Sequence, residues 1–449
     1  EPIAFDNADA LRRLARLCDA FLMHDRPIHT VCDDSVVRGS KGGFAPIRRS
    51  RGYAPLPIAL QNAATGDAAG TNGGGEQPTV LAVGGELKMA VCLAAANQAF
   101  LSQHIGDMGN RETIFALERA VEHLQALYRA TPQVLAADLH PGYISTQWAE
   151  RRARDQGVEL VRVQHHHAHA ASLIAEQQLP LDQPIIACVF DGTGYGTDGA
   201  IWGGEVLIAS AKEYRRAACL RYARLPGGDS CIALPAKTAL AFLHDYDLEW
   251  PVELGCVQHF TDKDRQRLLV QLTKGLNAVP TSSMGRMFDV VASLLGIRQA
   301  IDYEGQAAVE LEMLAVEGLM KETQVLPYPC VWQPGSLAQL DMRTTLQAII
   351  ADVRKGVHPR RIAAGWHQTV TSAVVEQCRL LRLHAPESQR VELNQVGLTG
   401  GVFQNNVLSA MLSEQLEQAG FEVLIHRVVP CNDGGLALGQ VLVARCLHR

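Results

Sequence analysis

The feature that most constrains the fold is a regular alternation of apolar runs and helical patterns, which begins near residue 79. Short apolar runs typical of buried strands occupy 80–83, 134–138 and 185–190, and segments with helical periodicity separate them. Such alternation is typical of α/β proteins, in which helices cover a mostly parallel sheet. The sequence therefore predicts an α/β fold for most of the chain.

Two stretches of the chain share one form. Residues 80–93 and 185–208 each contain a strand, a glycine-rich turn and a second strand. No short-period repeat accompanies them. The shared form predicts two related lobes, which we place at about 79–183 and about 184–449.

Residues 61–78 form the clearest linker, because Ala, Gly, Asn and Thr dominate them and three glycines, 73–75, lie near their end. The roughly sixty residues before the linker are few for an independent domain. We expect residues 1–60 to belong to a larger unit. The start at Glu1 rather than at a methionine predicts that upstream residues precede them.

Charge and cysteine content exclude several classes of protein. Lys and Arg number 41 and Asp and Glu number 47, a formal net charge of −6, which disfavours a general nucleic-acid binder. No apolar stretch is long enough to span a membrane. The eleven cysteines are odd in number and form no Cys-x-x-Cys pair, which predicts free thiols in a reducing compartment. We expect a cytoplasmic protein that binds neither nucleic acid nor membranes.

The run from Asp191 to Glu205 is the first candidate site. An apolar strand is predicted to end at Asp191, and the glycines after it would expose backbone amides. Such amides can hold a phosphate, while a strand-end carboxylate can hold a metal. A plain hairpin is the alternative, but so many glycines carry an entropic cost that a hairpin alone does not require. We therefore predict functional roles for Asp191, Gly192, Thr193 and Gly194.

A histidine-rich segment at 164–169 is the second candidate. His165 and His169 are spaced i, i+4, so on a helix both imidazoles lie on one face and can reach one metal ion. A solvated histidine-rich helix is the alternative. The nearby carboxylate of Asp191 favours the metal site, and with oxygen ligands such a site suits iron or zinc.

The segment 430–439 contains the sequence Asn432-Asp433-Gly434-Gly435 at a predicted helix start. Asp433 could cap this helix through its side chain. It could equally close the metal site as a second carboxylate ligand. The sequence leaves both roles open.

Weaker candidates for a nucleotide site are glycine-rich turns and polar residues near predicted helix starts. A strand that runs through Gly400 and Gly401 into a helix can bind a phosphate at the helix N-terminus. The other candidates are Gly227, Gly228, Asp229, Asp289, Gly305 and Asn405. Each of these alone is as compatible with a turn or a helix cap as with a binding site.

Taken together, these motifs resemble the HypF family of hydrogenase-maturation carbamoyltransferases. Residues from about 80 to 449 are similar to its TsaD-like domain, which belongs to the superfamily of actin and the sugar kinases. Residues 1–60 are similar to the last part of its YrdC-like domain, through segments such as 33–36 and 48–53. The resemblance implies a two-lobed, TsaD-like α/β domain at 79–449, preceded by a partial YrdC-like α/β segment.

The resemblance also implies roles for particular residues. His165, His169, Asp191 and Asp433 would hold a metal, iron or zinc, and the first three would take part in catalysis. The nucleotide, ATP or the adenylate made from it, would lie along Gly192, Thr193, Gly194, Gly227, Gly228, Asp229, Asp289, Gly305, Gly400, Gly401 and Asn405. Mg²⁺ would accompany the ATP.

A reaction follows from the same resemblance. Carbamate made from carbamoyl phosphate is condensed with ATP to carbamoyl-adenylate, and the TsaD-like domain transfers the carbamoyl group to the C-terminal cysteine of HypE. The product later becomes the cyanide ligand of a nickel–iron centre. The sequence contains only the end of the YrdC-like domain, so if it is the whole chain we expect only the transfer step to remain.

The chain departs from the family pattern at two places. Met89 stands where the family usually has Asn. Residues 234–237 replace an acidic-Pro-Trp-Arg run, so part of a substrate contact is expected to differ.

Four other functions remain open on the sequence. They are a small-molecule O-carbamoyltransferase of the antibiotic-tailoring type, a tRNA threonylcarbamoyl transferase, a sugar-kinase-like phosphotransferase and a nucleotide-binding scaffold without turnover. The acidic charge and the match at 191–205 disfavour the tRNA enzyme. A sugar-kinase-like enzyme does not need the histidine pair, so metal content distinguishes it.

Overall fold

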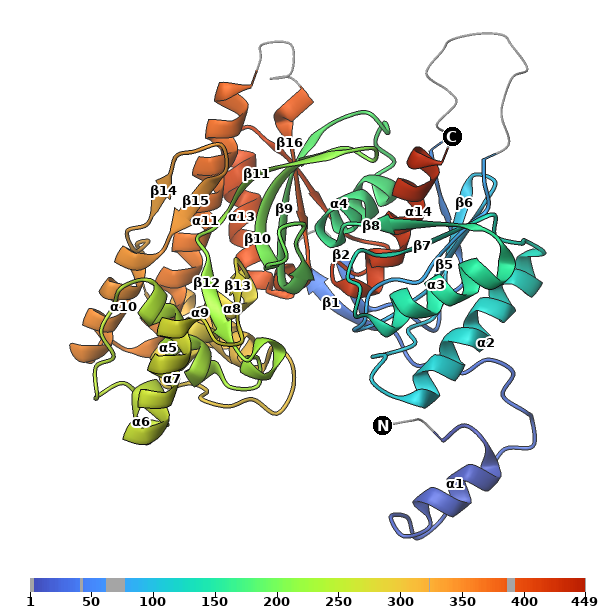
Figure 1. The fold of residues 1–449 in the computed structure, drawn as a ribbon, viewed down its shortest axis with the longest axis horizontal. Helices are drawn as coiled ribbons and strands as arrows, with labels where there is room; N and C mark the ends of the chain where they lie inside the picture. Colours follow the sequence, from blue (N-terminus) through green and yellow to red (C-terminus); the bar gives the residue numbers. More distant parts are fainter. Residues whose placement is uncertain (1–3, 41–42, 62–76, 323, 386–391, 449) are drawn as a thin grey trace.

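The computed structural model describes residues 4–40, 43–61, 77–322, 324–385 and 392–448, and two α/β halves lie side by side in it (Figure 1). Most of the predicted linker 61–78 lies outside the described residues.

The first half is built on a six-stranded sheet with the order β3-β6-β5-β4-β7-β8. Its strands are β3 (Pro57–Ala59), β4 (Val80–Ala82), β5 (Cys92–Ala95), β6 (Gln98–Leu101), β7 (Val134–Asp138) and β8 (Glu159–Val163). β4, β7 and β8 run parallel, while β4, β5 and β6 form an antiparallel meander. Every residue of β4 and β7 is buried, as expected of strands covered on both faces. α2 (Arg111–Tyr128) and α3 (Ile144–Gln156) cover one of these faces.

The second half is built on a nine-stranded sheet whose main path runs β14-β15-β11-β10-β9-β16-β17. Its strands are β9 (Ile185–Tyr195), β10 (Ile201–Ala209), β11 (Tyr214–Leu220), β12 (Ala223–Pro226), β13 (Ala278–Thr281), β14 (Val331–Gln333), β15 (Ala338–Asp341), β16 (Gln395–Thr399) and β17 (Glu422–Ile425). β9, β10 and β11 form an antiparallel meander, and β16 and β17 extend the sheet in parallel from β9.

One set of helices buries a large apolar core against one face of this second sheet. They are α5 (Pro235–Asp245), α6 (Gly255–Gln258), α7 (Asp262–Lys274), α8 (Met284–Leu294), α9 (Gln306–Lys321), α10 (Arg343–Arg354), α11 (Pro359–His384) and α13 (Asn406–Gln418). Short 3-10 helices are η1 (Gly228–Cys231), η2 (Glu392–Asn394), η3 (Gly401–Gln404) and η4 (Asp433–Gly435).

The two sheets repeat one strand order. The set β6-β5-β4-β7-β8 in the first sheet matches β11-β10-β9-β16-β17 in the second, with the same parallel and antiparallel pairings. The last strand of each set leads to a helix: β8 to α4 (His165–Glu176), and β17 through η4 to α14 (Leu436–Leu447). The predicted two-lobed α/β fold is therefore confirmed.

α4 and α14 pack against each other between the two sheets (Figure 1). Their backbones approach so closely that a Cβ atom on Gly439 would collide with the carbonyl oxygen of Ala168. Every residue of α4 from His165 to Ala175 is buried. The histidines of this helix are thus held inside the protein, which excludes the solvated histidine-rich helix.

The N-terminal segment contains α1 (Asn7–Leu14), which projects from the body in Figure 1, and the hairpin β1 (Val36–Ser40) and β2 (Gly43–Arg48). The hairpin contacts the second half, where Arg38 forms an ion pair with Glu312 at 2.6 Å. Asn432 donates a side-chain hydrogen bond to the carbonyl of Ile47 at 3.0 Å. β3, although it falls within the predicted segment 1–60, forms the edge of the first sheet. This segment therefore touches both halves.

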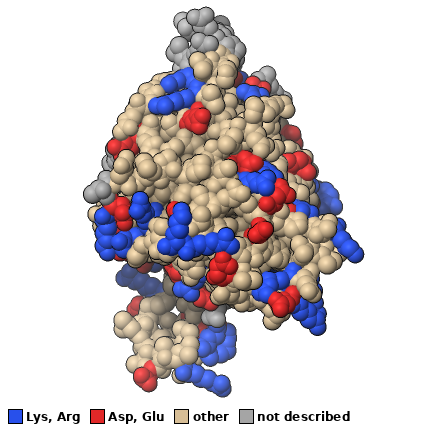
Figure 2. Space-filling model, turned by 90° about the vertical axis from the view of Figure 1, so that its left-hand side faces the viewer, with Lys and Arg blue, Asp and Glu red and all other residues tan. Residues whose placement is uncertain are grey.

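The surface carries charges of both signs. On the face in Figure 2, cationic and anionic side chains are interspersed over a largely uncharged surface. Among the helices of the described residues, none has the length and hydropathy needed to cross a bilayer.

Candidate metal and nucleotide site

Four side chains from three parts of the chain meet at the start of α4. His165 and His169 come from α4, Asp191 from β9 and Asp433 from η4, and one donor atom of each lies within 4.8 Å of the others. Nε2 of His169 is 3.1 Å from Oδ2 of Asp191 and 3.5 Å from Oδ1 of Asp433. Nε2 of His165 is 3.6 Å and 3.8 Å from the same two atoms. The structure thus brings together all four residues that were predicted as metal ligands.

Asp433 can face the histidines because its neighbour caps the turn. The side chain of Asn432 accepts a hydrogen bond from the backbone N–H of Gly434 at 2.9 Å, which is the capping role open to Asp433 on the sequence. Oδ1 of Asp433 instead points to Nε2 of His169. The capping role left open for Asp433 therefore belongs to Asn432, and the role of Asp433 as a metal ligand stays a prediction.

Asp191 lies within β9 and not at its end. The prediction that the strand ends at Asp191 is wrong, because β9 continues to Tyr195 and pairs with β10 through a register shift between Trp202 and Gly204. Oδ1 of Asp191 accepts the N–H of Gly192 at 2.7 Å. Its Oδ2 is left facing the two histidines.

The cluster has the properties of a metal site. Nε2 of His165, Nε2 of His169 and Oδ2 of Asp191 are buried and have no hydrogen-bond partner among the described residues. Buried polar atoms are rarely left without a partner. Four ligands at about 2.1 Å from a tetrahedral ion lie about 3.4 Å apart, and the histidine–carboxylate distances here run from 3.1 to 3.8 Å. Two imidazoles and two carboxylates suit zinc or iron, so these residues fit the predicted metal.

Opposite charges dominate the electrostatics of the cluster. Burial alone would lower the pKa of His165, but the charge and hydrogen bond of Asp138 together with the two carboxylates raise it well above its usual value. Burial alone would also lower the pKa of His169, but Asp191 and Asp433 raise it above its usual value. The histidines in turn hold the pKa of Asp191 well below its usual value against the effect of burial. A metal must displace protons from these imidazoles to bind.

A buried ion pair lies beside the glycines that follow Asp191. A Cβ atom on Gly192 would be 3.5 Å from Nη2 of Arg286, and Arg286 lies 3.1 Å from Asp289. Both side chains are buried, and several of their polar atoms have no hydrogen-bond partner among the described residues. Burial raises the pKa of Asp289 to about 6, with Arg286 opposing it. The predicted nucleotide residue Asp289 is therefore near the glycine-rich half of β9.

Gly400 and Gly401 also adjoin β9. Gly400 has a φ of 100°, and a Cβ atom there would collide with the carbonyl oxygen of Phe190. A Cβ atom on Gly401 would lie 3.0 Å from Oδ1 of Asp191. Gly400 needs a glycine because two backbones meet there, whereas a side chain at Gly401 would press on the carboxylate of Asp191.

The remaining predicted nucleotide residues are spread over the second half. The side chain of Asn405 caps α13 by accepting the N–H of Leu408 at 2.9 Å, and its Nδ2 lies 2.8 Å from Nε2 of His367. Gly305 begins α9 with a φ of 78°. The nucleotide roles of both residues stay predictions.

Gly227 and Gly228 lie at the start of η1, and both have positive φ angles. A Cβ atom on Gly227 would be 3.5 Å from Nζ of Lys237. Thr193 lies half-buried in β9. The side chain of Asp229 lies outside the part of the chain that the structure describes. Their roles in nucleotide binding stay predictions.

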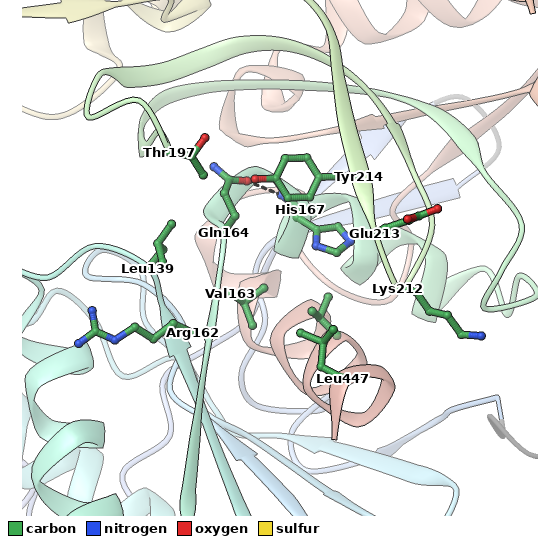
Figure 3. Close-up of a pocket in the computed structure, with 11 residues that line it drawn as sticks. Leu139, Arg162, Val163, Gln164, His167, Thr197, Lys212, Glu213, Tyr214 and Leu447 are labelled. Carbon is green, nitrogen blue, oxygen red and sulfur yellow. Dashed lines mark hydrogen bonds between the residues drawn. The ribbon is translucent and has the colours of Figure 1, made fainter. Parts of the chain in front are cut away.

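His167, within the same histidine run, faces elsewhere. It lines a cavity of about 320 Å³ between α4, the β10–β11 turn and the end of α14 (Figure 3). Its Nε2 donates to the carbonyl of Ser210 at 2.9 Å, while Oε1 of Gln164 accepts its backbone N–H at 2.8 Å and caps α4. Among adjacent histidines, the i, i+4 spacing therefore selected the pair that lies beside Asp191 and Asp433.

The sequence reasoning missed one residue that touches the cluster. Oδ2 of Asp138, at the end of β7, accepts a hydrogen bond from Nδ1 of His165 at 2.8 Å. The signal that could have found Asp138 is its place at the end of an apolar strand, since that same feature directed attention to Asp191.

Comparison with known proteins identifies the family of the chain. Residues 75–176 match the family model of the HypF Kae1-like domain, and residues 187–440 match that of the second subdomain of the carbamoyltransferase Kae1-like domain. The chain is also 36% identical over 375 residues to a carbamoyltransferase HypF homolog of Cupriavidus necator, covering 83% of this chain and 92% of the relative. This chain belongs to the HypF carbamoyltransferase family.

Longer HypF proteins match nearly the whole chain. Carbamoyltransferase HypF2 of Cupriavidus necator is 39% identical, over 99% of this chain and 55% of the relative, so the chain spans about half the length of the curated HypF relatives it matches. The crystal structure of full-length HypF in the phosphate- and nucleotide-bound form superposes with a TM-score of 0.88 at 37% identity, covering 99% of this chain and 65% of that one. The structure of T. kodakarensis HypF gives a TM-score of 0.85 at 31% identity, covering 99% and 56%.

Proposed function

We propose that this chain transfers a carbamoyl group from carbamoyl-adenylate to the C-terminal cysteine thiol of HypE, as a step in making the cyanide ligand of a nickel–iron hydrogenase. The observation that carries the proposal is the buried cluster of His165, His169, Asp191 and Asp433 beside the glycine-rich half of β9, in a chain of the HypF family. The phosphate- and nucleotide-bound state of the full-length HypF neighbour supports a nucleotide beside this cluster.

The transfer balances as a simple acyl substitution. The thiolate sulfur forms a bond to the carbamoyl carbon, and the bond from that carbon to the adenylate oxygen breaks. AMP leaves with the electron pair, and the thiol has given its proton to a base or to solvent. A metal in the cluster, iron or zinc, would neutralise phosphate charge.

The residues of this chain bind and orient the nucleotide in this proposal. We assign the nucleotide to the surface that Gly192 and Thr193 form with Arg286 and Asp289, because Gly192 has no Cβ and so leaves room next to a buried guanidinium. Gly194, which packs against the rings of His165 and His166, completes this part of the proposed site. The other predicted contacts, Gly227, Gly228, Asp229, Gly305, Gly400, Gly401 and Asn405, belong to the same proposal. ATP with Mg²⁺, and carbamoyl phosphate, would enter at the earlier, activating step.

A cavity lined by cationic side chains supports the proposal that the acyl-adenylate reaches the cluster from the side of the N-terminal segment. It measures about 250 Å³ and is lined by Arg48, Arg49, Lys88 and His104 together with residues next to Asp433. Lys88 pairs with Glu304 across the two halves and is also influenced by the charge of Asp433. An anionic acyl-adenylate would be attracted to this entrance.

The test is intact-mass analysis of HypE after incubation with the chain and carbamoyl-adenylate. We expect a carbamoyl mass increase on the C-terminal cysteine, and none with the His165→Ala variant or with HypE that lacks this cysteine. A second incubation supplies ATP and carbamoyl phosphate instead, and so asks separately whether activation occurs. No mass increase with preformed carbamoyl-adenylate would reject the proposal.

A further inference from the structure

Asp138 occupies a protected position behind the cluster. It is the last residue of β7 and is completely buried. β7 pairs in parallel with β8, so that Asp138 lies opposite Val163, directly before the turn into α4. The sheet therefore places this carboxylate at the first turn of the helix that carries both histidines.

Two hydrogen bonds fix the orientation of the Asp138 carboxylate. Oδ1 accepts the backbone N–H of His140 at 2.9 Å, in the turn that follows β7. Oδ2 accepts from Nδ1 of His165 at 2.8 Å. Because an ionised carboxylate only accepts hydrogen bonds, the proton in the second bond belongs to Nδ1 of His165.

We propose that Asp138 is a positioning residue that keeps His165 ready to bind the metal through Nε2. With Nδ1 protonated toward Asp138, a neutral imidazole presents its Nε2 lone pair, and this atom lies 3.6 Å from Oδ2 of Asp191 and is buried without a partner among the described residues. A carboxylate behind a ligand histidine fixes the tautomer and ring orientation and makes the imidazole a stronger ligand. The assignment rests on the metal cluster of the proposed function.

Asparagine at this position would reverse the hydrogen bond. If its amide oxygen still accepts from His140, the amide NH₂ faces Nδ1 of His165 and donates to it. The neutral imidazole must then carry its proton on Nε2, where the metal would bind. The Asp138→Asn variant keeps the size of the side chain while it presents the wrong tautomer.

The experiment measures Zn²⁺ affinity by competition with a chromophoric chelator, in the unmodified chain and in Asp138→Asn. We expect the variant to bind zinc about 10- to 100-fold more weakly, the range typical of changes behind a metal ligand. Zinc affinity needs neither nucleotide nor acceptor, so failure of the transferase proposal is seen separately. Equal affinity in the two proteins would overturn the role of Asp138.

The matched control is Asp245→Asn. Asp245 also accepts from a histidine, Nδ1 of His244 at 2.9 Å, and from the backbone N–H of Arg224 at 2.7 Å. It lies on α5 and is not part of the metal-ligand group found among the described residues. We expect this variant to lose folding stability and to keep the zinc affinity of the unmodified chain. A similar loss of zinc affinity in both variants would assign the Asp138 effect to general destabilisation and overturn the proposal.

A second measurement does not depend on the variant folding. Nitrogen-15 NMR of the zinc-loaded, histidine-labelled chain reports which ring nitrogen carries the proton. We expect one zinc-bound histidine to coordinate through Nε2 and to hold a proton on Nδ1 that exchanges slowly with solvent, because its partner Asp138 is buried. Zinc-bound histidines that all coordinate through Nδ1 would contradict the inference.

Discussion

The two lobes share a strand order but differ in the chemistry that follows equivalent strands. β4 and β9 occupy the same place in their sheets, and glycine-rich stretches follow the buried part of each. In the first lobe the next acidic side chain is Glu86. It accepts hydrogen bonds from the backbone N–H groups of Ile144 and Ser145, at 2.8 and 3.4 Å, at the start of α3. In the second lobe Asp191 faces the two histidines.

β7 and β16 form a second equivalent pair. β7 ends in Asp138, which touches the imidazole of His165, whereas β16 ends in Thr399, whose hydroxyl lies 3.4 Å from the carbonyl of His169 and 2.9 Å from Nε2 of His426. The comparison teaches that both lobes share one backbone plan but contribute different side chains to the cluster: two histidines come from the first lobe and two carboxylates from the second.

The largest effect is expected from removing the charge of Asp191. Asp191→Asn replaces a proposed ligand that faces both histidines. We expect zinc affinity to fall by more than about 100-fold, because changes to residues that only hydrogen-bond a metal ligand already lower the affinity about 10- to 100-fold. Zinc competition measures the effect, and a loss as small as that of Asp138→Asn would show that Asp191 does not ligate the metal directly.

The second largest effect is expected from replacing a glycine, and it should differ between Gly194 in the second lobe and Gly85 in the first. A Cβ atom on Gly194 would come within 2.7 Å of Cδ2 of His165 and would collide with His166, and both rings are buried. A Cβ atom on Gly85 meets Asp433 Oδ2 and Leu436 Cδ2 at a milder 3.3 Å. We expect Gly194→Ala to lower the free energy of unfolding by about 3 kcal/mol, and Gly85→Ala by less than about 1 kcal/mol. Urea denaturation compares the two, and equal losses would remove the distinction between the lobes.

Glu176 provides a pH-dependent test of the link between α4 and the segment before Asp433. Its carboxylate accepts the backbone N–H groups of Arg427, Val428 and Val429, and it contacts His426. Burial opposes these interactions, but they win and hold the pKa of Glu176 below its usual value. A lowered carboxyl pKa stabilises the fold above the unfolded pKa, and this contribution disappears as the pH falls through the folded pKa.

We expect Glu176→Gln to cost about 2 kcal/mol at pH 7, because a buried charged acceptor is lost. The difference from the unmodified chain should shrink below about pH 4.5, the region where glutamate takes up its proton. Unfolding by urea at pH 7 and pH 4 measures both values. A difference that is constant with pH would show that the charge of Glu176 does not matter.

The smallest effect is expected for Glu86→Gln. Burial raises the pKa of Glu86 more than the hydrogen bonds from Ser145 and Ile144 lower it, so its charge gains little in the folded state. A glutamine can still accept one of these bonds, and we expect a change below about 1 kcal/mol. Thermal unfolding checks this, with zinc affinity unchanged. A marked loss of zinc would instead place Glu86 in the site and break the contrast with Asp191.

The parts of the site that could be predicted are those with local signals. The spacing of His165 and His169 and the apolar run before Asp191 each lie within a few residues. The division of roles between Asn432 and Asp433 could not be predicted, because both side chains suit a helix cap. The predicted end of β9 was wrong because glycines weaken strand propensity in the sequence, while in the structure the pairing with β10 maintains the strand beyond Asp191.

The role of Asp138 could not be predicted in the same way, because its partner His165 lies 27 residues away in the sequence. That contact exists because β7 and β8 end side by side in the sheet. Sequence spacing does not show which strands are neighbours, so the contact between Asp138 and His165 could not be predicted from it. The two-lobed fold was predictable from the repeated strand-turn-strand form, whereas the close approach of α4 to α14 depends on Gly439, far along the chain.

The burial of α4 has a consequence for how an ion would reach the cluster. The histidine side chains are 0% and 1% exposed, while those of Asp191 and Asp433 are 11% and 15% exposed. An ion would enter past the carboxylates, shed its water there and meet the imidazoles last. The nucleotide is proposed to lie on that same side and would then close the entrance behind the ion. Metal loading would precede nucleotide binding, and chelators would strip the nucleotide-bound protein more slowly than the free one.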